Sequence, residues 1–441
     1  MAALQVLVER SRWQMIPAYA LSIVFCLIAL LPNRGPAHVA RRGTARRVMR
    51  VAGVALGALL LVISTALPIL IPIFRFPQPD GPYAIGTMTY HWVDPARPEV
   101  FTPNPGDHRE LMVQVWYPAK RDDSARRAPY VPDSSVLAAL ARLFGLPAFT
   151  FSHLQYVKTH AEPSAPVASG QRKYPVLLFS HGRGGFRQHN TFQVEQLASH
   201  GYVVATIDQP YVASGVVFPD GRLVKFDSRM FDPGHPGHPA FLDEVIPFLA
   251  QDVIFTLDQL ARLNQADPNG ILTGHLDLPR AGAFGVSLGG AVIAEACRLE
   301  PRLRGCLVMD VFMPADVVQS GLRQPVMWIT RDAASMQREG WAQRDIDETR
   351  TTMRAVFDRL PGQGYIVLVP GMFHPNFSDF PLYSPIGRWM GLTGPIDPQR
   401  GHEIVDAYTL AFFDRHVADR PAPLLDQRPS PYREAIFETR R

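Results

Sequence analysis

The sequence is poor in cysteine and in charge. It has three cysteines in 441 residues and no Cys-x-x-Cys pair, which excludes a disulfide scaffold and gives no zinc or redox motif. Charged residues make up 19% of the chain and apolar residues 47%, so an intrinsically disordered protein is excluded. Glycine and proline are plentiful but show no period, which excludes a collagen-like chain. The length and apolar content instead predict a large buried core.

Acidic residues are missing from one strongly basic stretch. Residues 34–50 contain six arginines and no acid, and residues 1–32 add a net charge of +1. The whole chain carries +4, so residues 51–441 carry −3. The basic pI therefore belongs to one short segment, which lacks the interleaved aromatic residues of a nucleic-acid site. We expect no nucleic-acid partner. The six residues are Arg34, Arg41, Arg42, Arg46, Arg47 and Arg50.

Two uncharged runs flank these arginines. Residues 13–33 and 51–74 contain no charge, and each is long enough to cross a bilayer, which takes about 20 apolar helical residues. The sequence predicts a membrane anchor over residues 1–75, with transmembrane helices at about 14–32 and 51–73. Because short arginine-rich loops stay cytoplasmic, loop 33–50 is predicted inside and residues 76–441 on the extracytoplasmic side. A cleaved signal peptide is the alternative for the first run.

The remaining residues, 76–441, are predicted to form one α/β domain. Apolar runs bounded by turn residues alternate with helical patterns, which predicts a mostly parallel sheet. The expected strands are 111–117, 176–180, 202–207, 281–286, 305–310, 325–330 and 365–369. The expected helices are 190–200, 245–263, 288–299, 336–360 and 403–417. Segment 130–165 reads as an apolar insertion, either a cap over a site or part of the core.

A possible nucleophile lies between one of these strands and the next helix. Gly285-Val286-Ser287-Leu288-Gly289 fits the pattern G-x-S-x-G, follows the apolar run 281–284 and opens a helix. That strand–turn–helix context is the one in which a sharp turn exposes a serine hydroxyl. A helix-capping serine is the alternative. We predict Ser287 as the nucleophile of an α/β-hydrolase.

The serine needs a base and an oxyanion hole. His374 directly follows the last expected strand and is predicted to be the base. The glycine-rich turn Ser180-His181-Gly182-Arg183-Gly184 follows strand 176–180, so the backbone N–H of Arg183, with that of Leu288, is predicted to bind the oxyanion. His181 is expected to brace this turn.

Two aspartates fit the place of the orienting acid. Asp310 ends the strand after the nucleophile helix, and Asp332 follows the next strand. Both satisfy the chain order serine, acid, histidine. Position along the chain leaves the choice open.

The chain resembles the plasma-type (isoform II) platelet-activating-factor acetylhydrolase family of the α/β-hydrolase superfamily, including its bacterial relatives. The resemblance implies Asp310 as the acid, His374 as the base, Asp379 as a supporting residue and Arg183 as the first oxyanion donor. The matching stretches are Gly81–Gly86, Val115–Pro118, Phe179–Gly182 with Gly184 and Phe186-Arg187, Leu197–Tyr202, the serine turn, Met309-Asp310 and His374–Phe380.

The chain departs from this family at two places near the predicted site. Val286 stands before the serine where many relatives have histidine, and Arg183 stands where the family often has an apolar residue. A cation at position 183 would favour an anionic substrate group.

Neither a metal nor another cofactor is predicted. His235 and His238, with Asp232 and Asp243, lie in a proline-rich segment without the His-x-x-x-His helical face of a zinc peptidase. No nucleotide-binding fingerprint stands in the right context.

We therefore expect a membrane-tethered serine ester hydrolase. The resemblance implies calcium-independent cleavage of short or oxidised sn-2 acyl esters of phospholipids. Two alternatives are a general carboxylesterase or dienelactone-type hydrolase acting on small soluble esters, and an inactive hydrolase fold serving as a membrane binding protein. The expected partners are the ester substrate and the membrane, and no oligomeric state is predicted.

Overall fold

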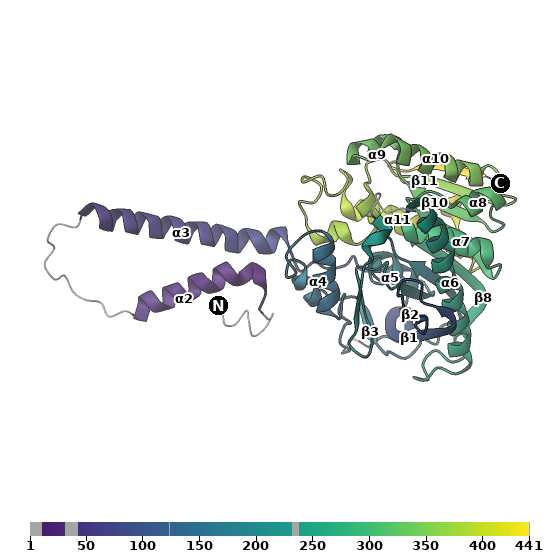
Figure 1. Ribbon diagram of the computed structural model, residues 1–441, viewed down its shortest axis with the longest axis horizontal. Coiled ribbons are helices and arrows are strands. Elements are labelled where there is room, and N and C mark those ends of the chain that lie inside the picture. Colours follow the sequence, from purple (N-terminus) through teal and green to yellow (C-terminus); the bar gives the residue numbers. More distant parts are fainter. Residues whose placement is uncertain (1–10, 31–42, 123, 232–237, 441) are drawn as a thin grey trace. The chain divides into compact units, whose positions relative to one another are not determined.

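The computed structural model describes residues 11–30, 43–122, 124–231 and 238–440 (Figure 1). The chain forms two compact units. One unit comprises residues up to Phe74 together with Tyr383–Ile386, and the other comprises Arg75–Leu382 and Gly387–Arg441.

The first unit contains helical elements only among its described residues. They are η1 (Trp13–Met15), α2 (Ile16–Leu30) and α3 (Gly43–Leu70). Within the described ranges, one helical stretch, Arg47–Leu70 of α3, is long and apolar enough to cross a membrane, and it is almost wholly exposed. Near the end of α3, the Ser384 hydroxyl donates to the Leu70 carbonyl at 2.6 Å, and the Phe74 and Tyr383 rings stack at 5.8 Å.

Two details of the predicted anchor need correction. The first predicted span, 14–32, appears as α2, whose 15 residues rise only about 22 Å against a hydrocarbon core of about 30 Å. Among the residues that the structure describes, a second transmembrane helix, and with it a multi-pass anchor, is therefore not supported. The predicted loop 33–50 also ends too late, because α3 begins at Gly43. Arginine favours helix, and no proline interrupts α3 before Pro68, so the arginines at 46–50 are helical. Residues 33–42 lie outside the described ranges.

The second unit is built on a ten-stranded sheet. Its strand order is β12-β11-β10-β9-β8-β4-β5-β2-β1-β3. The run from β11 to β5 is parallel throughout, while β12, β2 and β1 pair antiparallel to their inner neighbours. The strands are β1 (Ala84–Pro98), β2 (His108–Ala119), β3 (Ala161–Pro163), β4 (Tyr174–Ser180), β5 (Val203–Asp208), β8 (Leu276–Val286), β9 (Leu303–Met309), β10 (Val326–Thr330), β11 (Gly364–Leu368) and β12 (Ile436–Arg440). A separate hairpin pairs β6 (Gly215–Val217) with β7 (Leu223–Lys225).

Helices cover both faces of this sheet. The long helix α6 lies beside α7 over β4 and β8, and α5 packs with α11 on the other side (Figure 1). The central strands β4 and β9 are buried almost completely, as strands covered on both faces must be. The helices are α4 (Ser134–Leu143), α5 (Thr191–Ser199), α6 (His238–Gln265), α7 (Leu288–Leu299), α8 (Ala315–Ser320), α9 (Ala333–Glu339), α10 (Gln343–Phe357) and α11 (Pro398–His416), with short η2 (Ser152–Tyr156), η3 (Ser228–Phe231), η4 (His374–Phe377), η5 (Phe380–Tyr383) and η6 (Pro423–Leu425).

This architecture confirms the predicted α/β class. All seven expected strands are present, although β1, β3, β6, β7 and β12 were not foreseen. The single helix expected over 336–360 is two helices, because Gly340 takes a left-handed conformation (φ 93°) that ends α9. The apolar insertion 130–165 contains α4, η2 and β3.

Candidate active site

Ser287 occupies a sharp turn between β8 and α7. Its φ of 56° and ψ of −134° are unfavourable for a residue with a side chain. The turn is held because the Ser287 N–H donates to the Met309 carbonyl, and the Gly290 N–H donates to the Ser287 carbonyl, both at 2.8 Å. The half-buried serine is thus held by its backbone at the carboxyl edge of the parallel sheet.

Two glycines make this turn possible. A Cβ on Gly285 would lie 2.5 Å from the carbonyl carbon of Gly289, and a Cβ on Gly289 would lie 2.5 Å from the carbonyl oxygen of His181. Real Cβ atoms do not approach backbone so closely. The start of α7 can therefore pass against the ends of β8 and β4 only with glycine at both positions.

His374 opens η4 after β11, on a turn that buried polar groups hold. The Asn376 side-chain oxygen accepts from the N–H of Phe373 at 2.9 Å and from that of Gly394 at 2.7 Å. The His374 N–H donates to Glu339 at 2.9 Å. Its ring nitrogen Nδ1 lies 2.7 Å from Asp310 Oδ2.

Asp310 lies just after β9 and is fully buried with three partners. Besides His374, it accepts from the Thr330 hydroxyl at 2.7 Å and pairs with Arg331 Nε at 3.0 Å. Burial alone would raise the pKa of Asp310, but Arg331, His374 and Thr330 hold it below its ordinary value. The carboxylate therefore stays ionised beside the histidine.

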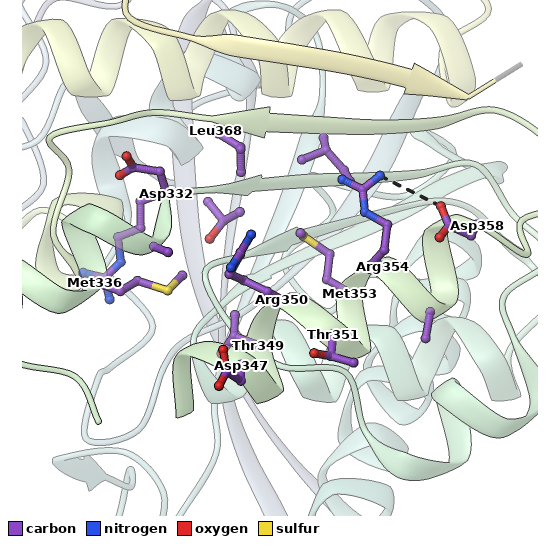
Figure 2. A pocket seen from close by; sticks show the side chains of 15 residues that line it. Asp332, Met336, Asp347, Thr349, Arg350, Thr351, Met353, Arg354, Asp358 and Leu368 are labelled. Carbon is purple, nitrogen blue, oxygen red and sulfur yellow. Dashed lines mark ion pairs between the residues drawn. The ribbon is translucent and has the colours of Figure 1, made fainter. Parts of the chain in front are cut away.

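Asp332 has a different role in the structure. Its side chain accepts from the Ser335 N–H at 3.1 Å and caps the start of α9. It also lines a cavity of about 570 Å³ that is bordered by α9, α10 and the ends of β10 and β11. Figure 2 shows Asp332 and Met336 on one side of this cavity and Arg354 of α10 on the other.

The predicted oxyanion donors lie beside Ser287. Leu288 is the first residue of α7, where backbone N–H groups have no acceptor within the helix. Arg183 follows Gly182, on which a Cβ would lie 2.9 Å from the Ser287 Cβ, so this turn passes directly beside the serine. Partial desolvation lowers the pKa of the Arg183 guanidinium to about 10.

His181 braces this turn from beneath. Its Nε2 accepts from the Gln209 N–H at 3.3 Å, so Nδ1 carries the hydrogen and donates to the Gly182 carbonyl at 2.7 Å. Burial lowers the pKa of His181, which favours the neutral ring. The Gln209 side chain in turn accepts from the Ser180 hydroxyl at 3.1 Å. Gln209 therefore contacts both Ser180 and His181, the first two residues of the turn.

Asp379 connects the segment that follows His374 with the start of α5. Its carboxyl accepts from the N–H groups of Thr191 at 2.9 Å and Phe192 at 3.1 Å, so it holds the start of α5 against the segment that carries His374. Burial raises the pKa of Asp379 well above its ordinary value.

The sequence reasoning did not foresee three further residues at the site. Thr330 and Arg331 hold Asp310, and His189 borders Gly185 of the glycine-rich turn. Burial, and then the nearby His181 and His374, lower the pKa of His189 to about 3, so the ring is neutral. The sequence could have indicated Thr330 and Arg331, because they lie at the carboxyl end of β10, the strand that neighbours β9, which Asp310 follows.

The proline-rich segment around His235 and Asp232 is mostly outside the described part of the chain. Residues 232–237 lie outside the described ranges, and the structure says nothing of them.

A family model described as "Platelet-activating factor acetylhydrolase, isoform II" matches residues 71–211 and 265–422, well over half of the chain. The chain belongs to this family. Membership places it among the ester hydrolases, as the serine turn and the Asp310–His374 pair led us to expect.

Similar proteins agree with this assignment. The chain is 23% identical to the platelet-activating factor acetylhydrolase of Gallus gallus over 383 residues, which cover 78% of this chain and 84% of the relative. It is 24% identical to a probable 1-alkyl-2-acetylglycerophosphocholine esterase of Arthroderma benhamiae, with 82% and 94% covered. A solved ferulic acid esterase from Streptomyces cinnamoneus is 29% identical, with a TM-score of 0.66, over 82% of this chain and 99% of that one.

Proposed function

We propose that this family member hydrolyses its ester through a triad of Ser287, His374 and Asp310. The observation that carries the proposal is the 2.7 Å hydrogen bond between His374 Nδ1 and a buried, ionised Asp310. With Nδ1–H donated to Asp310, the other ring nitrogen, Nε2, keeps the lone pair that a general base needs.

The proposed reaction proceeds in two stages. His374 Nε2 removes the proton of the Ser287 hydroxyl as its oxygen attacks the ester carbonyl, and Asp310 stabilises the resulting imidazolium. The N–H groups of Leu288 and Arg183 bind the negative carbonyl oxygen. His374 then protonates the leaving alcohol and activates the water that releases the acid. Because side chains supply nucleophile and base, we propose a calcium-independent reaction.

The proposed substrates are phospholipids with short or oxidised sn-2 acyl chains. Two of the relatives are named for hydrolysing such an acetyl ester, and the model of their family covers the serine turn, Asp310 and His374 in this chain. Arg183 follows Gly182, whose backbone passes beside Ser287, and a cation at this position would suit a substrate that carries a phosphate.

We further propose that α3 anchors the enzyme in a membrane. Arg47 and Arg50 lie at the N-terminal end of α3, and basic residues favour the cytoplasmic side. The catalytic unit, which follows the other end, would then be extracytoplasmic. A reporter fused at the C-terminus that is active only in the cytoplasm would contradict this orientation.

Triad variants test the mechanism. Ser287→Ala is expected to abolish hydrolysis of a short-chain phospholipid and labelling by a fluorophosphonate probe. Asp310→Asn is expected to lower kcat by about 10²–10⁴-fold, and Asp332→Asn, which retains a capping side chain, to leave it unchanged. Full activity of Ser287→Ala, or loss in the Asp332 variant alone, would refute the assignment. Activity in excess EGTA tests calcium independence.

A carboxylesterase acting on small soluble esters is the second candidate. The structural similarity to a ferulic acid esterase, at higher identity than the acetylhydrolase relatives show, favours it. A chain-length series of p-nitrophenyl esters, measured beside a short-chain phospholipid, separates the two. Higher kcat/KM on the phospholipid supports the first proposal, and higher kcat/KM on the aryl esters supports the second.

A further inference from the structure

A second cavity of the α/β unit lies away from the proposed triad. It has a volume of about 660 Å³ and is bordered by α5, α11 and the segments 77–80 and 421–424. None of Ser287, Asp310 and His374 lines it, so the proposed ester chemistry does not account for it.

His402 of α11 brings a buried ring nitrogen to this cavity. The residue is only 2% exposed, and its ring stacks on that of Phe192 at 3.8 Å. Burial lowers the pKa of His402 to about 4, so the ring is neutral, and Nε2 donates its hydrogen to the Ser378 carbonyl at 2.9 Å. The other nitrogen, Nδ1, is therefore an acceptor, and it has no hydrogen-bond partner among the described residues.

Asp406 has the same property one helical turn further along α11. Residues four apart lie on the same face of a helix, and both His402 and Asp406 line the cavity. The Oδ1 atom of Asp406 is buried and also has no hydrogen-bond partner within the described part of the chain. Buried polar atoms are normally paired, so two unpaired acceptors at one cavity indicate a ligand that donates hydrogens to both.

The cavity carries a surplus of negative charge. Three further carboxylates border it, whereas Arg400 is the one lysine or arginine among the described residues that line it. Arg400 already pairs with Glu434 at 2.9 Å and with Glu403 at 3.3 Å. The hydrogen donor that fits this cavity is therefore a cation. The three carboxylates are Asp80, Glu403 and Asp414.

Asp406 responds to this surplus. Burial, and then the charges of Asp80, Asp379 and Glu403, raise the pKa of Asp406 well above its ordinary value. A cation beside Asp406 would relieve the repulsion. The same carboxylates would repel the anionic group of an amino acid or of a phosphate-bearing amine, which favours a ligand with positive groups only.

Apolar side chains lie between the charged ones. Ala407, Leu410 and Leu424 line the same cavity, and they suit methylene groups rather than a hydrated ion. A metal ion fits less well, because the described residues contain no group of three or more histidine, cysteine, aspartate or glutamate side chains that could hold one. Ammonium groups joined by short aliphatic chains match both the carboxylates and the apolar walls.

We propose that this cavity is a binding site for an aliphatic polyamine. One ammonium group donates to His402 Nδ1 and to Asp406, and the others lie at the border carboxylates. The site adds a ligand to the ester hydrolysis proposed above and does not depend on it.

Calorimetric titration of the full chain in a neutral detergent with spermidine tests the site. Wild type is expected to bind one spermidine saturably. Asp406→Asn, which keeps the shape of the side chain and removes its charge, is expected to weaken binding about tenfold or more. The matched control Asp316→Asn removes an exposed carboxylate from α8, which packs on α7 at the other face of the sheet, and is expected to bind as wild type does.

A second variant tests the location without removing a charge. Ala407→Leu fills part of the cavity and is also expected to weaken binding about tenfold or more, while urea unfolding checks that each variant is folded. Magnesium chloride in place of spermidine is expected to give no saturable binding that depends on Asp406.

Three results would overturn the proposal. They are the absence of saturable spermidine binding to wild type, equal affinity in wild type and Asp406→Asn, and Asp406-dependent binding of magnesium that is tighter than that of spermidine. Failure of the proposed esterase mechanism gives a different result, because Ser287→Ala is expected to bind spermidine with the wild-type affinity whether or not Ser287 is the nucleophile.

Discussion

Replacing Gly289 by alanine tests whether the serine turn is built as described. Its added Cβ would lie 2.5 Å from the His181 carbonyl oxygen, so backbone has to retreat by about 1 Å. The Ser180 carbonyl oxygen, at the end of β4, would lie closer still, and neither backbone atom can rotate away. Overpacking typically costs about 1–3 kcal/mol, and we expect at least the upper value here because the neighbour is backbone. The displaced carbonyl also precedes Arg183, a predicted oxyanion donor, so activity should fall with stability.

The next residue provides the matched control. A Cβ on Gly290 would lie 2.9 Å from a methyl group of Val311, 3.1 Å from one of Val308 and 3.2 Å from the Gly285 carbonyl oxygen, so its shortest contacts are to side chains and its one backbone contact is longer than those of Gly289. Alanine also gains about 1 kcal/mol over glycine within a helix. Gly290→Ala is therefore expected to change the free energy of unfolding by no more than about 1 kcal/mol.

Urea unfolding and the rate of fluorophosphonate labelling measure the two effects. Gly289→Ala should lose about 3 kcal/mol or more and react at least tenfold more slowly than wild type. If both variants unfold and react alike, the close approach of α7 to β4 is wrong, and with it our account of the turn.

Three further changes probe the carboxyl groups. Thr330→Val removes a hydrogen-bond donor from buried Asp310, so the free energy of unfolding at pH 7 should fall by about 1.5–3 kcal/mol. Because the pKa of Asp310 is lowered in the fold, this difference between variant and wild type should shrink on acidification below about pH 4. A difference that stays constant with pH would contradict this account. Asp379 has a raised pKa, so its contribution to the free energy of unfolding is lost as pH rises above about 4. In urea unfolding measured at a series of pH values, Asp379→Asn should show a smaller decline of this free energy with pH than wild type. An equal decline in the two proteins would argue against it. Asp332→Ala should cost about 1 kcal/mol of stability through loss of a helix cap while kcat/KM stays at the wild-type value, and a large loss of kcat/KM would reopen its role as the acid.

The sequence predicted the α/β class and the strand–turn–helix around Ser287 because both depend on local patterns. Apolar runs give buried strands, and glycine at fixed spacing permits the turn. Its failures were of two kinds. Strands at or next to the edges of the sheet, such as β1, have a weak pattern because many of their residues face solvent. A single glycine, Gly340, divided a helix whose periodicity looked continuous.

The choice between Asp310 and Asp332 shows what needs tertiary structure. Both aspartates follow parallel strands, and chain order permits either as the acid. The partner of Asp310 comes from another element, because β11 ends in the turn that brings His374 to it. The partner of Asp332 is an N–H group three residues ahead, in the helix that Asp332 itself caps. No local pattern encodes that difference.

By itself, the sequence determined the chemistry that the chain offers: a serine at a glycine turn, a histidine after the last parallel strand and a basic stretch before an apolar helix. Tertiary structure decided which groups meet. Arg331 and Thr330 hold Asp310 ionised, and the glycine-rich turn after β4 passes directly beside Ser287. The physical reason is that propensity and turn geometry act between near neighbours, whereas burial and the pairing of charges depend on residues that only the folded sheet brings together.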